Sequence, residues 1–505
     1  MPPKVKAVPK TAPVKPAFDS TRTHRQYKEY MKRWEQINIC LDGEEAVKQK
    51  RETYLPYPVR LDDVDKTDDA FLLQYQLYLE GAHFVEYTAE AVEDLISSAF
   101  RRPLELEPEL PKELEHLDVT DLSKELVGTV GAYGRAFAFV DYPTVDTQPS
   151  AADDDNNAAY LNIYEPLDVL DWTETKRSGK SELIRVVLRE IDTVREAEED
   201  IAEAIYMYRE LLIKDGKFTM IVHRDDRESV TYIPKANGSH FTEIPGVFIG
   251  TTSNTVKVDK SPVMGISNSN LKHYQTWADL MHVQVYTGNP QLVLAGLAAG
   301  WNKQAERNKV TVKLDASQVL ALEGDNSSAS LLEIDTNSLV HFRTLEVLEQ
   351  SMAEQGAKIK SISKKSGVES AEALKIRSSA SMSKLAAIVA NVEDALNKCI
   401  VWAGLYMGET VTTQVTINKE FFAPAPDGSL LSSISEAEAV GTAPRGTAIT
   451  YLKQIELVSD DKSNEEYLAD MELYQPQLTS DIKPDGTDVK GGKKPEKKKE
   501  NPTEK

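Results

Sequence analysis

The tetrapeptide Ser178-Gly179-Lys180-Ser181 has the residue types that end a phosphate-binding loop, in which backbone amides and a lysine hold a nucleotide. Such a loop also needs a glycine at position 174, but this chain has Glu174 there, and its carboxylate would repel phosphate. The residues that follow, Glu182–Glu190, alternate like a strand, so no helix N-terminus would face the phosphates. The tetrapeptide is therefore predicted to be a hairpin turn, with a nucleotide site as the alternative.

A second candidate for nucleotide chemistry is the glycine series Gly128, Gly131 and Gly134. A dinucleotide fingerprint follows a strand and opens a helix. This series instead lies in a helical pattern and precedes the strand-like segment Ala136–Asp141. We predict that these glycines end a helix and permit close packing.

Metal and acid–base chemistry would require clustered side chains, and the sequence marks out no such cluster. The eight histidines form neither an HExxH nor an HxH motif, and no two acids stand out as an acid–base couple. His273 and His282 should lie on opposite faces of one predicted helix, as surface or core residues. The sequence thus predicts no catalytic residues, no metal ligands, no cofactor and no enzymatic activity. The open alternative is a nuclease whose distant acids assemble around Mg²⁺.

Size and charge narrow the function classes. The chain has 505 residues, enough for two or three domains, and a formal net charge of −22. Two basic ends, residues 1–22 at +4 and residues 483–505 at +3, leave a body of about −29 between them. Such a body argues against a sequence-reading DNA-binding protein, but not against one that DNA slides past. The sequence shows no signal peptide, no membrane-spanning run and only two distant cysteines, Cys40 and Cys399, which favours the cytoplasm.

Periodicity predicts the elements that must position any site. Helices are expected within residues 23–55 and at Phe71–Phe100, Leu122–Tyr133, Ser267–Tyr286, Thr344–Ile362 and 371–407. Strands are expected at Ala136–Asp141, at Leu161–Tyr164, Val169–Trp172, Leu183–Glu190, Ile205–Leu212, Lys217–His223 and Val230–Ile233, and near Val310–Leu314, Val319–Leu322 and Ser330–Ile334. On Phe71–Phe100, the side chains expected to face inward are Leu73, Leu77, Phe84, Val85, Val92, Leu95 and Ile96.

The helix at 371–407 is unusual for its length. Apolar and small side chains recur along it at three- and four-residue steps, with no proline. At about 1.5 Å per residue it would be roughly 50 Å long, whereas a mean helix has about 11–12 residues. It therefore needs close neighbours along its whole length. Lys364-Lys365-Ser366-Gly367-Val368 precede it, and Ser366 and Glu369 stand at capping-box spacing.

Several segments, in this order, resemble the portal proteins of tailed bacteriophages. Residues 134–143 (GRAFAFVDYP) and 164–172 (YEPLDVLDW) are similar to two consecutive strands of one portal family. Pro262-Val263-Met264 with Asn270–Gln275 is similar to the family's entry into a helix, and Ser370–Leu374, Ser383–Ala386 and Trp402–Gly404 are similar to its long C-terminal helix. The resemblance spans roughly residues 25–410. The threonine usual near the start of the long helix is absent, since the chain reads Ser-Ala-Glu-Ala there.

The resemblance implies an α+β fold, namely a portal fold with an α/β wing, a helical stem, a small α/β clip, a long helix and a C-terminal crown. The implied segments are a disordered arm (1–22), the wing (23–262), stem helices (263–288 and 341–362) around the clip (289–340), a tunnel loop (363–370), a long wing helix (371–408), the crown (409–482) and a disordered lysine-rich tail (483–505).

The resemblance also implies a function. The protein would form a homo-oligomeric ring, typically of twelve subunits, at the portal vertex of a virion capsid assembled in the host cytoplasm. Implied partners are double-stranded DNA passing through the channel, the terminase, the major capsid and scaffolding proteins and a tail adaptor, with no membrane. The tunnel loop, Lys364, Lys365, Ser366, Gly367 and Val368, would be the segment nearest the DNA.

Three alternatives stay open at this point. Lys364 and Lys365 could form a weak basic belt around the channel or could be two solvated lysines beside a helix. The protein could be another structural head or adaptor protein of the virion. It could also be a nuclease-like packaging component, which a metal-dependent cleavage assay would reveal.

Overall fold

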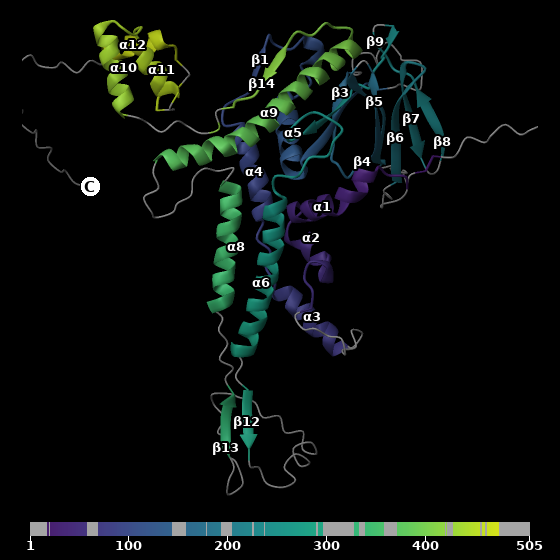
Figure 1. Ribbon diagram of the computed structural model, residues 1–505, viewed down its shortest axis with the longest axis vertical. Helices are drawn as coiled ribbons and strands as arrows, with labels where there is room; N and C mark the ends of the chain where they lie inside the picture. Colours follow the sequence, from purple (N-terminus) through teal and green to yellow (C-terminus); the bar gives the residue numbers. More distant parts are fainter. Residues whose placement is uncertain are drawn as a thin grey trace, which may run out of the picture. The chain divides into compact units, whose positions relative to one another are not determined.

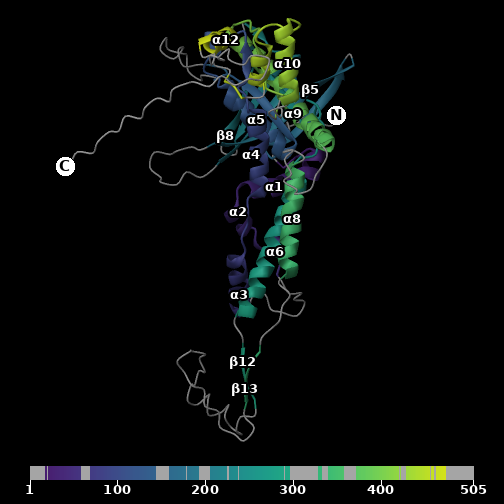
Figure 2. The same cartoon turned by 90° about the vertical axis from the view of Figure 1, so that its left-hand side faces the viewer.

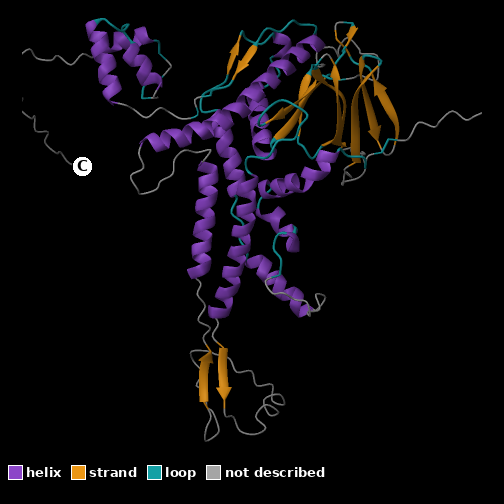
Figure 3. Ribbon diagram, in the orientation of Figure 1, coloured by secondary structure: helices purple, strands orange, loops and turns teal. Residues whose placement is uncertain are grey.

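The computed structural model (Figure 1) describes residues 18–19, 21–57, 69–143, 158–177, 179–192, 205–224, 227–236, 238–288, 291–295, 328–332, 339–357, 371–419, 421, 428–454, 457–459 and 462–473. Two compact units divide the chain, Met1–Phe421 and Phe422–Lys505. The predicted lysine-rich tail and almost all of the predicted N-terminal arm lie outside the described residues. The first unit combines helices with antiparallel sheets (Figure 3), which confirms the predicted α+β class.

The first unit opens with short helices. They are α1 (Arg25–Leu41), α2 (Glu44–Gln49), the 3-10 turn η1 (Arg51–Thr53), α3 (Asp69–Gly81) and α4 (Tyr87–Ala99). The prediction of one helix over Phe71–Phe100 is wrong, because the chain leaves helical geometry between α3 and α4. The side chain of Asn270 holds this break: it donates to the Val85 carbonyl (2.8 Å) and accepts from the Thr88 amide (3.1 Å). A tertiary contact thus overrides the local periodicity.

The inward face expected for this segment is only partly correct. Phe84, Val92 and Leu95 are buried, as predicted. Leu73 and Leu77 on α3 are instead 61% and 60% exposed, which corrects the prediction that they face the core. The buried side chains of α3 are Tyr75, Tyr78 and Leu79, which join the hydrophobic cluster around Cys40, Phe84 and Tyr274.

A three-stranded antiparallel sheet forms the centre of the first unit. Its strand β2 (Arg135–Asp141) lies between β11 (Gly246–Gly250) and β3 (Tyr160–Tyr164), and every residue of β2 is buried. Two helices, α5 (Val119–Tyr133) and α9 (Ala371–Met407), pack against β2. The predicted helix Leu122–Tyr133 and the predicted strand Ala136–Asp141 are confirmed.

The glycines before β2 serve packing and helix termination, as predicted. Gly134 caps the C-terminus of α5 with a φ of +80°. A Cβ there would lie 2.8 Å from the backbone of Lys260, so both conformation and space favour glycine. Gly128 and Gly131 let α5 approach α4 closely, since a Cβ at each would lie 2.9 Å from an α4 side chain.

A five-stranded antiparallel meander follows. Its strands, in spatial and sequence order, are β4 (Val169–Arg177), β5 (Lys180–Asp192), β6 (Ile205–Lys214), β7 (Lys217–Arg224) and β8 (Arg227–Tyr232). The six strands predicted between Leu161 and Ile233 are thereby confirmed as β3 to β8. Arg177 pairs with Lys180 across the β4–β5 turn, and Gly179 has a φ of +80°. The described residues of the tetrapeptide, 179–181, therefore lie at a hairpin turn that opens into a strand, as predicted, and Ser178 lies outside the described residues.

Two long helices and a hairpin project from the first unit (Figure 1). They are α6 (Met264–Gly288), β12 (Gln291–Ala295) paired antiparallel with β13 (Ser328–Leu332), and α8 (Leu339–Ala357). The structure confirms the predicted helices that became α6 and α8, although α8 begins before the predicted Thr344. The strand β12 was not predicted because its central residues are all apolar and do not alternate. The strands predicted at Val310–Leu314 and Val319–Leu322 lie outside the described residues.

The remaining elements are short. β1 (Glu105–Glu107) pairs with β14 (Gln414–Thr416), and β9 (Lys235–Ala236) pairs with β10 (Ser239–His240). The 3-10 turn η2 (Lys112–Leu114) precedes α5. The second unit contains α10 (Gly428–Val440), α11 (Thr447–Gln454) and α12 (Asn464–Leu473), where Asn464 Nδ2 donates to Thr450 Oγ1 at 2.7 Å.

Candidate functional site: the α6–α8 helix pair and the long helix α9

The predicted site residues Lys364, Lys365, Ser366, Gly367 and Val368 all lie outside the described residues. The structure describes what flanks them: α8, which ends at Ala357, and α9, which begins at Ala371. The described elements that the portal resemblance groups with this segment are these two helices, α6 and the β12–β13 hairpin.

The helices α6 and α8 form an antiparallel pair. Gly265, near the start of α6, lies against Gln355, near the end of α8, so closely that a Cβ would sit 2.2 Å from the Gln355 Oε1 atom. Farther along the pair, His273 of α6 contacts Glu349 of α8, with 3.2 Å between His273 Nε2 and Glu349 Oε1. Leu345 and Met352 are the buried apolar side chains of α8. Small residues, a polar pair and an apolar seam thus hold the two helices together.

His273 is the ionisable group at the centre of this pair. Its side chain is fully buried. Burial lowers the pKa of His273, and this outweighs the opposing effect of the Glu349 carboxylate. A neutral His273 is therefore the form that the folded pair favours at neutral pH. Sequence reasoning placed His273 on a helix as a surface or core residue but could not find its partner, because Glu349 is distant in sequence.

Polar contacts from the N-terminal segments also hold α6 in place. Asn270 bonds to Val85 and Thr88, as described above, and Tyr78 of α3 donates to Asp279 Oδ1 at 2.7 Å. Gln275 Nε2 donates to the Tyr54 carbonyl at 2.7 Å. The helix α6 lies between α3 and α8 in both views (Figures 1 and 2).

The long helix α9 has 37 residues, which confirms the predicted helix at 371–407. Its C-terminal part is embedded, with buried side chains from Leu385 to Ala403. Two polar side chains also bond to the surrounding backbone: the buried Glu393 accepts from the Ile417 amide through Oε1 at 2.7 Å, and the half-buried Asn391 donates from Nδ2 to the Gly250 carbonyl at 2.7 Å. The predicted need for close neighbours is met along this part of α9 by α5, β2, β11 and β14.

A charged cluster in the first unit bridges the sheet of β2 and the five-stranded meander. Arg209 of the meander forms ion pairs with Asp141 of β2 and with Glu190 Oε2, the latter at 3.0 Å. Tyr164 donates to the same Glu190, and burial together with this carboxylate raises the pKa of Tyr164. A neighbouring Arg185 pairs with Asp171 and Glu210, each at 2.6 Å. Because an arginine neutralises each of these acids, the cluster is suited to joining sheets rather than to proton transfer.

Arg135 is a second buried cation, with a different environment. Its guanidinium lies between two aromatic rings, 4.1 Å from the Trp172 centroid and 3.9 Å from the Phe248 centroid. Burial lowers the pKa of Arg135 to about 9, an effect that Asp259 partly opposes. The ring contacts replace hydrogen bonds here, since the Nη1 and Nη2 atoms have no hydrogen-bond partner.

Other side chains that could support chemistry are inaccessible. Cys40 and Cys399 are buried, and burial raises the pKa of their thiols to about 11 and about 12, respectively. Neither thiol is therefore a ready nucleophile. Within the described ranges, no group of histidine, cysteine, aspartate or glutamate side chains is arranged to hold a metal ion. Over the same ranges, no helix is long and apolar enough to cross a membrane.

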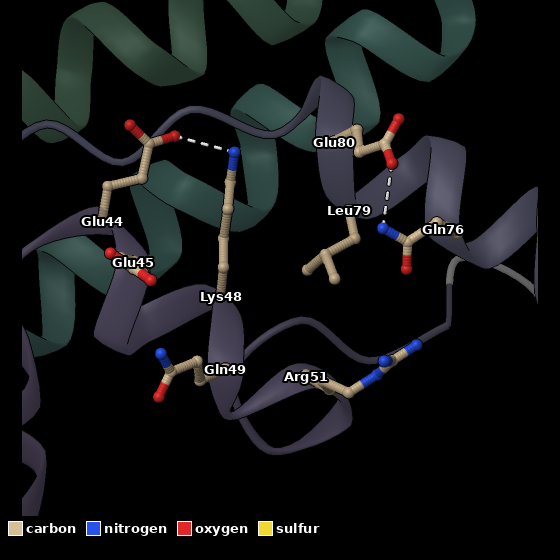
Figure 4. Close-up of a pocket in the computed structure, with 8 residues that line it drawn as sticks. All are labelled: Glu44, Glu45, Lys48, Gln49, Arg51, Gln76, Leu79 and Glu80. Carbon is tan, nitrogen blue, oxygen red and sulfur yellow. Dashed lines mark hydrogen bonds and ion pairs between the residues drawn. The ribbon is translucent and has the colours of Figure 1, made fainter. Parts of the chain in front are cut away.

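A groove of about 720 Å³ lies between α2, η1 and α3 (Figure 4). Its lining residues are Glu44, Glu45, Lys48, Gln49, Arg51, Gln76, Leu79 and Glu80. These side chains bond among themselves: Lys48 Nζ lies 2.8 Å from Glu44 Oε1, and Gln76 Nε2 donates to Glu80 Oε1 at 2.9 Å. The groove therefore resembles a solvated surface whose polar side chains pair with one another, and its lining residues include no acid–base couple.

The comparisons with known proteins give one family match. Residues 262–407 match the sequence model of a domain of unknown function, DUF4055. The match covers less than half of the chain, but its bounds enclose α6, the β12–β13 hairpin, α8 and α9 as one block. No curated protein matches the chain.

Two solved structures are similar to the chain at low levels. The first, titled "Virion of native gene transfer agent (GTA) particle", has 11% identity and a TM-score of 0.36, and the match covers 80% of this chain and 98% of that chain. The second, titled "Neck of empty GTA particle computed with C6 symmetry", has 12% identity and a TM-score of 0.35, with 76% and 90% covered.

Proposed function

We propose that this chain is a portal subunit of a tailed-phage-like particle, which forms a ring-shaped channel at one capsid vertex. The observation that carries the proposal is the element order α6, β12–β13 hairpin, α8, α9. An antiparallel helix pair closed by a hairpin, followed by a 37-residue helix anchored in the sheet-containing body, matches the stem, clip and long wing helix of the portal resemblance. The wing, stem, clip, tunnel loop, long helix and crown would have the bounds that the portal resemblance implies.

The proposed channel is passive. DNA would pass through it during packaging and ejection, and ATP hydrolysis would belong to a separate terminase motor. In keeping with this role, the only phosphate-loop candidate that the sequence offered is a hairpin turn. The acidic body would keep DNA mobile, because extensive phosphate pairing would brake its movement. The further partners are the capsid and scaffolding proteins, and a tail adaptor after packaging; the protein is located in the virion.

Electron microscopy of the purified full chain tests this proposal. We expect negatively stained rings with a central hole, of about twelve subunits. A chain that stays monomeric in micrographs and by light scattering under every assembly condition would contradict it. A metal-dependent DNA-cleavage assay distinguishes the nuclease alternative, for which we expect no activity.

The lysine pair Lys364 and Lys365 would line the narrowest part of this channel as a weak basic belt. The double variant Lys364→Gln/Lys365→Gln should package or retain DNA abnormally while still forming rings. Normal packaging and retention by this variant would show that the two lysines are ordinary solvated residues.

A further inference from the structure

Two helices on opposite sides of α6 expose apolar faces that no described part of the chain covers. On α3, Leu73 and Leu77 are 61% and 60% exposed, one helical turn apart. On α8, Leu339 and Val347 are 74% and 61% exposed, and Val340 between them is 57% exposed. Single exposed apolar residues are common on soluble proteins, but aligned stripes of them mark interaction surfaces.

The sequence pattern itself indicates that the α3 stripe belongs in an interface. Leu73 and Leu77 fit the apolar periodicity that predicted them to face inward, yet the folded chain leaves them on the side of α3 opposite the buried Tyr75. The helix is therefore apolar on two faces, and only one of these is covered by α6 and its neighbours. A helix that is apolar on both faces is normally covered on both.

The helix α8, like α3, is apolar on two opposite sides. Leu345 and Met352 pack toward α6, while Val340 and Val347 lie on the opposite side. The helix α6 lies between α3 and α8 (Figures 1 and 2), and each stripe lies on the side of its helix away from the buried side chains, so the two stripes do not face each other. They cannot cover each other within one chain.

Charges next to the two stripes are complementary. Asp69 lies four residues before Leu73 on α3, and Arg343 lies four residues before Val347 on α8, so each charge continues its stripe by one turn. Both side chains are exposed, and neither has an ion-pair partner in the described part of the chain. An acid on one flank and a base on the other favour contact between unlike flanks over contact between like flanks.

We propose that the α3 stripe of one subunit packs against the α8 stripe of the next subunit, with Asp69 facing Arg343. This is a heterologous, head-to-tail contact between two copies of the chain, and such contacts close into rings when the rotation between copies permits. Closure into a ring rests on the proposed function, whereas the contact between the stripes does not. An isologous dimer would instead place Leu77 against Leu77.

Cysteine cross-linking tests which stripes meet. The double variant Leu77→Cys/Val347→Cys, treated with a short bis-maleimide, should give a ladder of covalent oligomers on a denaturing gel. The native thiols do not interfere, because Cys40 and Cys399 are buried. Either single variant alone should give no dimer above the wild-type level, and an equimolar mixture of the two single variants should give covalent dimers only.

A matched control uses Ile191, which is 61% exposed on the distant strand β5. The double variant Ile191→Cys/Val347→Cys should stay monomeric on the gel. Dimers from Leu77→Cys alone would overturn the inference in favour of an isologous contact. No ladder from a double variant that still forms rings in micrographs would overturn it while leaving the portal proposal standing. A ladder or dimers without rings would support the contact and contradict the portal proposal.

Discussion

Two regions of the chain differ in how completely their apolar side chains are buried. One is the body, formed by the sheet of β2 with α5 and the embedded part of α9, and the other is the helical layer of α3, α6 and α8. In the body, every residue of β2 is buried, and the embedded part of α9 has side-chain hydrogen bonds to the backbone around it. In the helical layer, α6 is covered on two sides, while α3 and α8 each leave an apolar stripe exposed. The first region is completed within one chain, whereas we propose that the second is completed by another copy. Truncation of equivalent leucines should therefore have opposite consequences in the two regions.

The largest difference should come from Leu396→Ala compared with Leu77→Ala. Leu396 is 1% exposed in α9, so its truncation should lower the free energy of unfolding by about 2–5 kcal/mol. Leu77 is 60% exposed, so its truncation should change the stability of the isolated subunit by less than about 0.5 kcal/mol. Urea denaturation of the unassembled chain measures both. Equal losses would show that the two regions do not differ in this way.

Leu77→Ala should instead weaken assembly. The ring fraction at a fixed subunit concentration, measured by analytical ultracentrifugation, should fall for Leu77→Ala. Exposed Ile191→Ala on β5 serves as the control and should leave the ring fraction unchanged.

The next effect concerns the two glycines with a φ of +80°. Gly134→Ala should destabilise the body by about 1–3 kcal/mol, because the new Cβ would lie 2.8 Å from the Lys260 backbone in addition to the unfavourable φ. Gly179→Ala meets no atom within 4 Å, so only the conformational cost of about 1 kcal/mol remains. Thermal unfolding should rank Gly134→Ala below Gly179→Ala; the reverse order would contradict the close packing of the body.

The buried His273 should make the stability of the helical layer depend on pH. Burial lowers the pKa of His273 below its unfolded value of 6.5, so the unfolded chain binds more protons between these two pKa values. The stability that a neutral His273 contributes is full above pH 6.5 and is lost as the pH falls through the folded pKa. The slope is at most about 1.4 kcal/mol per pH unit. His273→Gln should flatten urea-unfolding stability between pH 5 and 6.5 relative to wild type, and an unchanged slope would argue against a buried neutral imidazole.

The smallest effect should come from the exposed charges. Asp69→Arg or Arg343→Asp alone should weaken ring assembly by about 0.2–1 kcal/mol, the usual range for exposed ion pairs. The double variant Asp69→Arg/Arg343→Asp should recover most of this loss, because the pair is restored with reversed polarity. Sedimentation at low salt makes the effect largest. If the double variant did not recover ring assembly, that result would contradict the proposed pairing of the two stripes.

Local patterns were sufficient to predict much of the fold. Alternation predicted the meander strands, and the glycine positions predicted both the 178–181 turn and the end of α5. Long-range contacts were not predictable: Asn270 interrupts the helix expected over Phe71–Phe100, and Glu349 reaches His273 from a helix far along the chain. The strand β12 was missed because an apolar run carries no period.

The candidate site was predicted less completely than the fold. Its residues, Lys364 to Val368, were chosen from a family resemblance and lie outside the described residues. The wrong prediction for the exposed α3 stripe is more instructive. Periodicity predicted that Leu73 and Leu77 face the core, but both are exposed in the folded chain, and a sequence pattern does not distinguish a core face from a face that another molecule covers.

The anchoring of α9 also has a mechanical consequence. Its embedded part is fixed from Leu385 onward, and the helix extends from there back to Ala371, an arm of about 21 Å at 1.5 Å per residue. An α-helix of this length transmits force as a lever whose fulcrum lies near Leu385, where the embedded part begins; Asn391 and Glu393 bond to the body beyond this point. A rotation of about 5° at the fulcrum would displace the N-terminal end of α9 by about 2 Å. Small strains in the body would thus be amplified at the end of α9 nearest to Lys364 and Lys365 in sequence.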